Sequence, residues 1–336
     1  MTQDSVDELD LALINALQLT PRASWSRLGR TLGVDPVTAA RRWERLREAG
    51  LAWVTCSVGP ALHHAFCMAY IEIACRPGTL GSVAAALSGL AETRYVHHLT
   101  GDRPLLAVVG LPAPSDLACY LSGVLDTMPG VLSHRAELRT AGYGEPGRWR
   151  LRSLEPAQKQ ALEPGGPPRT PPPAARVDAV DRALYRLLHE DGRMPFAALA
   201  SRAGISEATA RRRVGRLLDT RSLRLRCEAA QSITGWPVTA VLRASVPPTD
   251  LDATARSLAA LPDVRLCCSL TGPRNLLLML WLRDLPDLPR VEASLTGQTP
   301  ALTLHERAIC LHTPNQMGRL LTPDGRATGY VAPFSG

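Results

Sequence analysis

The chain has 336 residues, about twice the usual size of one domain, which predicts more than one domain. Its 45% hydrophobic and 21% charged residues exclude a globally disordered protein. Its net charge of +7 comes almost entirely from arginine, which is expected either from a GC-rich genome, the stronger explanation, or from a polyanionic partner. The acidic N-terminal sequence lacks the apolar core of a signal peptide, and apolar runs such as Leu276–Leu282 are only strand-sized. We therefore expect a cytoplasmic protein without a membrane partner.

The chain matches itself when it is shifted by 171 residues. Between Asp7–Leu51 and Asp178–Ser222, 14 of 45 positions are identical, whereas composition alone gives about 3. The register continues further on, where LTGDRPLL at Leu99–Leu106 lies over LTGPRNLL at Leu270–Leu277. A period of this length is too long for a solenoid, so we predict two tandem copies of one unit of about 140 residues.

The first copy opens with three predicted helices. Apolar residues from Val6 to Leu17 recur on one helical face. A second helix is expected from about Ser24 to Leu32, and Gly33 ends it. Asp35 is a suitable N-cap and Pro36 suits the first helical position, so a third helix begins there. This order predicts a helix-turn-helix.

The third helix carries small residues at its beginning and arginines along its outer face. Small side chains let a helix enter the major groove, where Thr and Arg contact base edges or phosphates. The alternative is an amphipathic helix with a solvated arginine face, but the same pattern recurs in the second copy. The residues predicted to contact DNA are Thr38, Ala39, Arg41, Arg42, Arg45, Thr209, Ala210, Arg211, Arg212, Arg213 and Arg216.

The rest of the first copy alternates strand and helix patterns. The order βαββαβ predicts a ferredoxin-like unit, which usually covers one sheet face with helices and the other by dimerisation. The two units of the chain are expected to pair either within one chain or between chains. Strands are expected at Ala65–Ala74, Tyr95–Leu99, Leu105–Leu111 and Val131–Leu138, and helices at Thr79–Leu90 and Ser115–Met128.

A proline-rich linker separates the copies, and the second copy repeats the plan of the first. Glu145–Arg176 contains eight prolines, and its last part is expected to form neither helix nor central strand. The second βαββαβ order runs from Val238 to Leu311, and a loop is expected after Pro314. The predicted segments are two helix-turn-helix domains at 1–58 and 177–229, two ferredoxin-like domains at 59–143 and 230–314, the linker at 144–176 and a tail at 315–336.

Taken in order and seen twice, these motifs resemble the Lrp/AsnC (feast/famine) family of bacterial transcription regulators. DELDLALINAL at Asp7–Leu17, RRWERL at Arg41–Leu46 and TARRRVGRL at Thr209–Leu217 are similar to its helix-turn-helix, and PDVRLCCSLTG at Pro262–Gly272 is similar to its sensing domain. The resemblance implies an α+β fold with two winged-type helix-turn-helix domains and two ferredoxin-like (βαββαβ) ligand-sensing domains. It also implies a homo-oligomeric regulator that binds double-stranded DNA and a small-molecule effector.

The effector site of that family lies around the turn between the second and third strands of the sensing domain. Its usual acidic residue is replaced here by Pro104 and Asn275, which disfavours an amino acid, whereas arginines in the same turns favour an anionic metabolite. The other interpretation is a plain hairpin turn in which glycine supplies a positive φ and arginine is solvated. The residues implicated in effector binding are Thr100, Gly101, Arg103, Thr271, Gly272 and Arg274.

An enzyme of the same architecture is the alternative. A branch of similar fused proteins decarboxylates sirohaem with His and Tyr residues at the second and third strands. RYVHHLTGDRPLL at Arg94–Leu106 matches that pattern poorly, although His97 and His98 keep the alternative open. The eight cysteines form no C-x-x-C pair, and no G-x-S-x-G motif or phosphate loop occurs. We therefore expect neither enzymatic activity nor a metal or cofactor.

Overall fold

The computed structural model describes residues 6–144, 150–163 and 176–333, apart from the side chains of residues 63–65. The chain forms two compact units, one built from residues of 1–65 and 150–230 and the other from residues of 66–149 and 231–334. Each copy of the repeat is therefore divided between the two units. In the part of the chain that is described, no helix is long and apolar enough to cross a membrane. The predicted boundaries of the individual domains stay predictions.

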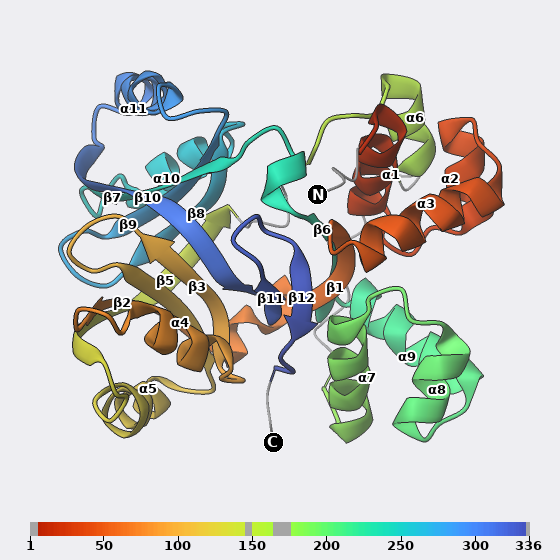
Figure 1. The fold of residues 1–336 in the computed structure, drawn as a ribbon, viewed down its shortest axis with the longest axis horizontal. Coiled ribbons are helices and arrows are strands. Elements are labelled where there is room, and N and C mark those ends of the chain that lie inside the picture. The colour runs from red at the N-terminus through yellow and green to blue at the C-terminus, as the bar shows by residue number, and fades with distance from the viewer. Residues whose placement is uncertain (1–5, 145–149, 164–175, 334–336) are drawn as a thin grey trace. The chain divides into compact units, whose positions relative to one another are not determined.

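The first unit contains two groups of three helices, one from each copy (Figure 1). Asp7 and Asp178 cap the first helix of each group in a capping box. Gly33 and Gly204 end the second helices with φ values of 71° and 66°, a conformation that favours glycine. The predicted three-helix order is thus confirmed twice. The helices are α1 (Glu8–Leu19), α2 (Trp25–Leu32), α3 (Pro36–Glu48), α7 (Ala179–Glu190), α8 (Phe196–Ala203) and α9 (Glu207–Asp219).

One strand follows each helix-turn-helix, and these two strands pair with each other. β1 (Ala52–Val58) and β6 (Leu223–Ala229) are antiparallel, with Thr55 opposite Arg226. These residues are separated by the repeat offset, so the register places a local twofold axis between them. Local sequence patterns do not predict either strand, because each finds its partner only in the other copy. The 3₁₀ helices η1 (Pro60–Ala65) and η4 (Gln231–Ile233) follow the strands.

The segment predicted as a linker contains a helix, α6 (Pro156–Leu162). Leu162 is fully buried, and its carbonyl accepts a hydrogen bond from the Thr20 hydroxyl at 3.0 Å. The Arg27 guanidinium donates to the Ala161 carbonyl at 2.8 Å. This part of the segment therefore packs on the first helix-turn-helix. The proline-rich stretch 164–175 lies outside the described residues.

The second unit contains two βαββαβ motifs, which confirms the predicted ferredoxin-like order in both copies. The first motif consists of β2 (Cys67–Cys75), α4 (Leu80–Ser88), β3 (Thr93–Leu99), β4 (Leu105–Leu111), α5 (Pro114–Tyr120) continued by η2 (Leu121–Leu125), and β5 (Val131–Gly144). The second consists of β7 (Val238–Ser245), α10 (Leu251–Ala259), β8 (Val264–Leu270), β9 (Leu276–Leu282), α11 (Asp287–Gln298) and β10 (Thr303–Gln316).

The strands of both motifs form one sheet that closes on itself. Their order is β3-β4-β2-β5-β8-β9-β7-β10, and β10 pairs with β3. The two joints between the motifs are equivalent, because Arg139 lies opposite Leu270 at one joint and Cys310 lies opposite Leu99 at the other. The two ferredoxin-like motifs therefore pair within the chain, a point that the sequence left open.

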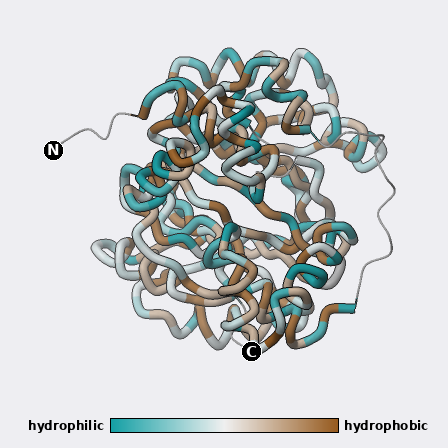
Figure 2. The backbone as a smooth tube through the Cα atoms, turned by 90° about the vertical axis from the view of Figure 1, so that its right-hand side faces the viewer, coloured by the Kyte–Doolittle hydropathy of each residue, from teal (hydrophilic) through white to brown (hydrophobic). Residues whose placement is uncertain are grey.

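Alternation along the strands divides their apolar side chains between the two sides of the closed sheet. On one side Ile71 packs in a core with Val83 of α4, and Leu278 packs in a core with Leu258 of α10. Figure 2 shows hydrophobic and hydrophilic residues following one another along the backbone. The other side forms a core from both motifs, made of Tyr70, Leu99, Leu106, Val108, Val241, Leu266, Cys268, Leu270, Leu277 and Met279.

The end of the chain forms strands, which corrects the prediction of a loop after Pro314. β10 extends to Gln316, and β11 (Arg319–Leu321) pairs with β10 and with β12 (Ala327–Tyr330). Asn315 is fully buried, and its side-chain amide donates to the Ser88 carbonyl at 2.8 Å. The composition of the tail does not predict these strands, because β11 forms by pairing with β10.

Candidate DNA-binding and effector sites

The beginnings of α3 and α9 present exposed side chains in equivalent positions. The Asp35 carboxylate accepts a hydrogen bond from the Val37 backbone N–H at 2.8 Å, which fixes the start of α3, and the Val37 side chain is 74% exposed. Arg41 and Arg212 occupy equivalent positions and are exposed. Among the described residues, no hydrogen bond or ion pair holds either guanidinium group. Both groups are therefore available to a ligand.

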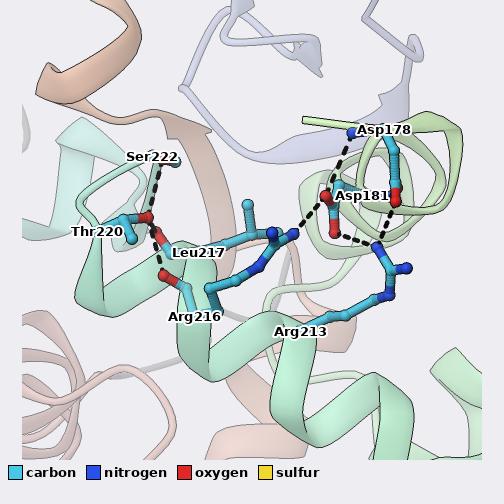
Figure 3. A network of polar contacts seen from close by, with 7 residues as sticks. All are labelled: Asp178, Asp181, Arg213, Arg216, Leu217, Thr220 and Ser222. Atoms are coloured by element: carbon cyan, nitrogen blue, oxygen red, sulfur yellow. Dashed lines mark hydrogen bonds and ion pairs between the residues drawn. The ribbon is translucent and has the colours of Figure 1, made fainter. Parts of the chain in front are cut away.

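The next arginines of α9 are held within their own domain, as Figure 3 shows. Arg213 contacts Asp178 at 2.7 Å and Asp181 at 3.0 Å, and Arg216 contacts Asp181 at 2.5 Å. The Asp181 side chain is fully buried on α7. A carboxylate that is removed from water needs paired cations and hydrogen bonds, so the two arginines join α9 to α7.

The first copy repeats this arrangement. Arg42 contacts Asp7 at 2.6 Å and Asp10 at 3.0 Å, and Arg45 also pairs with Asp10. Helical periodicity predicts a solvent-facing position for these four arginines, but their guanidinium groups join the third helix to the first. The repeat contained the missed signal, because the two aspartates recur together with the two arginines. Contact of these four arginines with DNA stays a prediction.

The remaining predicted DNA-binding residues lie in different environments. Ala39 and Ala210 are 1% and 0% exposed, so their side chains pack inside their own domains, and their contact with DNA stays a prediction. Thr38 and Thr209 are half-buried at the helix beginnings. Arg211 pairs with Glu207 at 2.8 Å, and its guanidinium lies 4.4 Å from the ring centroid of Phe196. Of these side chains, only the exposed ones suit direct contact with bases.

The two helix-turn-helix domains hold each other through a reciprocal pair of arginines. Arg22 donates to the carbonyls of Gly192 and Met194 at 2.7 and 2.9 Å. Its equivalent, Arg193, donates to the carbonyls of Pro21 and Ala23 at 2.7 and 3.0 Å. Each guanidinium also lies over an aromatic ring of the other domain, at 4.4 Å from Phe196 and 4.0 Å from Trp25. Arg22 and Arg193 are identical residues at the repeat offset, and that identity is the signal by which the sequence marks them.

The Asp178 carboxylate gives the fold a dependence on pH. The backbone N–H of Asp181 and the Arg213 guanidinium lower the pKa of Asp178 from 3.8 to about 2. Because the folded-state pKa is the lower one, this stabilisation is present above about pH 4 and is lost as the pH falls towards 2. We expect the melting temperature of Asp178→Asn to fall less steeply than that of the wild type between pH 5 and 2. Equal slopes in thermal melts across this range would contradict the assignment.

The threonines of the predicted effector turns belong to the joints of the closed sheet. The Thr100 hydroxyl accepts from the Ile309 backbone N–H at 2.9 Å, and the Thr100 N–H donates to the Ile309 carbonyl at 2.9 Å. Thr271 makes the equivalent pair of bonds with Leu138, at 3.0 and 2.9 Å. Both hydroxyls therefore have a structural role between the two motifs.

The two turns differ in their other side chains. Gly101 and Gly272 have φ values of 109° and 95°, as the hairpin interpretation expects. Arg274 forms an ion pair with Glu306, and the Asn275 amide bonds the Val246 backbone through both of its polar atoms. In the first turn, by contrast, one terminal nitrogen of Arg103 is buried and has no hydrogen-bond partner among the described residues.

His97, His98 and His312 lie at the β3–β10 joint. The Nδ1 atom of His97 lies 3.0 Å from the Thr313 hydroxyl, and its ring stacks on Tyr95 with 5.6 Å between centroids. Burial lowers the pKa of His97 to about 4, so its imidazole is neutral at pH 7. His98 lies opposite His312. Within the described parts of the chain, no group of three or more His, Cys, Asp or Glu residues has the arrangement of a metal site.

Two helix-turn-helix domains and a closed pair of ferredoxin-like motifs define a DNA-binding regulator. The AsnC-type helix-turn-helix domain model matches residues 6–47 and 177–218. An uncharacterized HTH-type transcriptional regulator of Pyrococcus abyssi is 31% identical over 116 residues, which cover 34% of this chain and 73% of that protein. One of Pyrococcus horikoshii is 30% identical over 115 residues, with the same coverage. The chain belongs to the Lrp/AsnC family of transcriptional regulators.

A solved structure extends the comparison to nearly the whole chain. The siroheme decarboxylase NirDL, in co-complex with an iron-uroporphyrin III analogue, has a similar fold with a TM-score of 0.59. The likeness covers 93% of each chain at 14% sequence identity. At this identity the likeness shows the fold alone. The expected α+β architecture, with both kinds of domain present twice, is thereby confirmed.

Proposed function

We propose that one chain binds an operator with both of its helix-turn-helix domains, one domain at each half-site. The observation that carries this proposal is the equivalent exposure of Arg41 on α3 and Arg212 on α9, with no partner among the described residues. Half-sites about 34–36 Å apart, or a multiple of that spacing, suit paired helix-turn-helix domains. Because Ala40 in α3 is replaced by Arg211 in α9, the two half-sites need not share one sequence.

Arg212→Ala and Arg41→Ala are expected to weaken operator binding without unfolding the protein. A guanidinium that reads a guanine contributes about 1–3 kcal/mol, which corresponds to a loss of roughly 5- to 150-fold in affinity. If Arg212 contacts only phosphate, the loss is independent of sequence and the salt dependence becomes shallower. Affinity is measured on a bound site found by genome-wide mapping, at two or more salt concentrations.

Arg212→Lys is the matched control for this prediction. Lysine keeps the positive charge but lacks the planar fork that bonds two acceptors of one base. We expect it to restore most of the non-specific binding and little of the preference for the operator. Unchanged operator affinity in both Arg212→Ala and Arg41→Ala would remove these residues from the interface.

The proposed regulation acts through an anionic effector at the turn of the first copy. Arg103 offers a buried nitrogen without a partner, whereas its equivalent Arg274 is neutralised by Glu306. The position equivalent to Glu306 is Arg135 in the first copy, and Arg135 pairs with Glu72, so the carboxylate that neutralises Arg274 has no counterpart for Arg103. A carboxylate or phosphate group is the natural partner of such arginines. The proposal therefore gives each chain one effector site.

Arg103→Met is expected to abolish stabilisation by the effector, whereas Arg274→Met is expected to keep it. A ligand present at about 100 times its Kd stabilises the folded state by about 2.7 kcal/mol, which is visible in a thermal-shift assay. The screen uses small carboxylic acids, phosphates and amino acids. An amino acid that stabilises both variants equally, or a set of acids without effect on the wild type, would contradict the anionic site.

The alternative activity is decarboxylation of a tetrapyrrole, which is favoured by the likeness of fold to NirDL and by His97 and His98 on β3. A neutral, hydrogen-bonded imidazole at His97 is a poor source of protons at pH 7. We therefore expect an absorbance titration with sirohaem to show no saturable change. Saturable binding with formation of a decarboxylated product would establish the enzyme.

A further inference from the structure

A charged cluster is buried in the second unit. It lies on the side of the closed sheet where both motifs form a common core. Arg243 of β7 donates to Glu72 of β2 at 3.0 Å and to Glu137 of β5 at 2.5 Å. Arg135 of β5 contacts the other oxygen of Glu72 at 2.9 Å. The Arg243 side chain is only 3% exposed. The cluster therefore consists of two carboxylates and two guanidinium groups that depend on one another for compensation.

The cluster lies on the local twofold axis that relates the two ferredoxin-like motifs. Glu72 and Arg243 are separated by the repeat offset, so they are equivalent residues that contact each other. Two equivalent residues make direct contact only where the axis passes between them. The equivalents of the other members, Glu306 for Arg135 and Ala308 for Glu137, do not reproduce the charges. At the axis the two motifs therefore carry opposite charges, whereas two identical motifs would carry the same charge.

This complementarity acts against pairing between two identical motifs. Two first-copy motifs in the same geometry would bring one Glu72 against another, with two copies of Glu137 nearby. Two second-copy motifs would bring one buried Arg243 against another, although each then has Glu306 opposite it on β10. Like charges placed together out of water are strongly unfavourable. The pair of first-copy motifs is the worse one, because its four carboxylates meet only the two Arg135 guanidinium groups and lack the cation that Arg243 supplies here.

We infer that these axial charges make the first-copy motif an interaction surface that accepts only a second-copy motif. Its occupant here is the second half of the same chain, and the only other partner that fits is the second half of another copy of this chain. Each pair of joined halves then contains one α3 and one α9, never two of a kind. The consequence for operator asymmetry rests on the proposed function, whereas the pairing rule does not.

The test exchanges the two axial charges between full-length chains. Glu72→Arg alone and Arg243→Glu alone each create a mismatch within the chain, so both variants are expected to lose thermal stability. Combined in one chain, Glu72→Arg and Arg243→Glu restore a net charge of zero and the ion pair on the axis. Arg135 and Glu137 then each face a like charge, so we expect a melting temperature above that of either single variant and below that of the wild type. A double variant that is no more stable than the less stable single variant overturns the proposal.

A disulfide cross-link measures which motifs pair with each other, and this measurement does not require DNA. The Thr140 and Ser269 hydroxyls lie 2.7 Å apart across the joint between β5 and β8. One chain carries Glu72→Arg and Thr140→Cys, and a second, differently tagged chain carries Arg243→Glu and Ser269→Cys. Only pairing between the two chains matches the charges and brings the introduced cysteines together. Disulfide-linked peptides are identified by mass spectrometry after the two chains are co-expressed.

The matched control uses the same two cysteine substitutions in chains with the natural axial charges. These chains satisfy their charges internally, so the charge-exchanged mixture is expected to give roughly tenfold more of the interchain disulfide. Equal amounts in both mixtures, with the combined variant folded, overturn the inference. Because neither readout uses DNA or an effector, failure here is distinguishable from failure of the proposed function.

Discussion

Replacing Arg243 with methionine is expected to lower the free energy of unfolding by about 3–5 kcal/mol, the range for removing one partner of a buried ion pair. Arg243 bridges Glu72 and Glu137, and its loss leaves Glu137 buried without that cation. Methionine fills a similar volume without supplying a charge. Urea denaturation followed by circular dichroism measures the change, provided that the transition is two-state.

The control for this prediction removes the charges together. Glu72→Met, Glu137→Gln and Arg243→Met in one chain eliminate the buried ions, and Arg135 is 32% exposed, so its charge reaches water. Buried ion pairs replaced by well-packed apolar groups are often neutral or stabilising, so we expect this variant to be at least as stable as the wild type. Wild-type stability in Arg243→Met itself would contradict the role assigned to the cluster.

Arg193→Ala is expected to lower the stability of the first unit by about 2–3 kcal/mol, because hydrogen bonds from a charged group are worth more than neutral ones. The substitution removes two hydrogen bonds to the carbonyls of Pro21 and Ala23 and the contact with the Trp25 ring. Both carbonyls belong to the other helix-turn-helix domain, so the joint between the domains weakens. Thermal melts followed by tryptophan fluorescence report the change.

The repeat supplies the controls for this second prediction. Arg22→Ala removes the equivalent bonds to Gly192 and Met194 and is expected to have an effect of similar size. Arg30→Ala alters an exposed arginine of α2 and is expected to leave the melting temperature unchanged. An effect of Arg30→Ala equal to that of Arg193→Ala would show that loss of charge, rather than the reciprocal contacts, determines stability.

The sequence predicts the elements that depend on local signals. N-caps such as Asp35, the glycine that ends α2 and the alternation of apolar residues identify most helices and strands, and internal repetition identifies the two copies. The missed strands β1, β6, β11 and β12 depend on partners far along the chain or on a neighbouring hairpin. These strands form only when they pair, and a short stretch of sequence does not contain the partner strand.

The candidate site was predictable as a helix but not residue by residue. Periodicity places Arg41, Arg42 and Arg45 on the polar side of α3, yet it does not distinguish an arginine that meets a ligand from one that meets Asp10. The distinction depends on the packing angle between α3 and α1. In the effector turns, likewise, the sequence shows Thr100 but not the strand that engages its hydroxyl.

Hydroxyl-radical footprinting on one operator, with wild type, Arg41→Ala and Arg212→Ala, tests the central claim most directly. If α3 and α9 of one chain each bind one half-site, the wild type protects two non-identical half-sites about one helical turn apart, or a multiple of that spacing. Arg41→Ala then loses protection at one half-site, and Arg212→Ala loses it at the other. A perfectly palindromic footprint, or equal loss at both half-sites in each variant, would contradict the account.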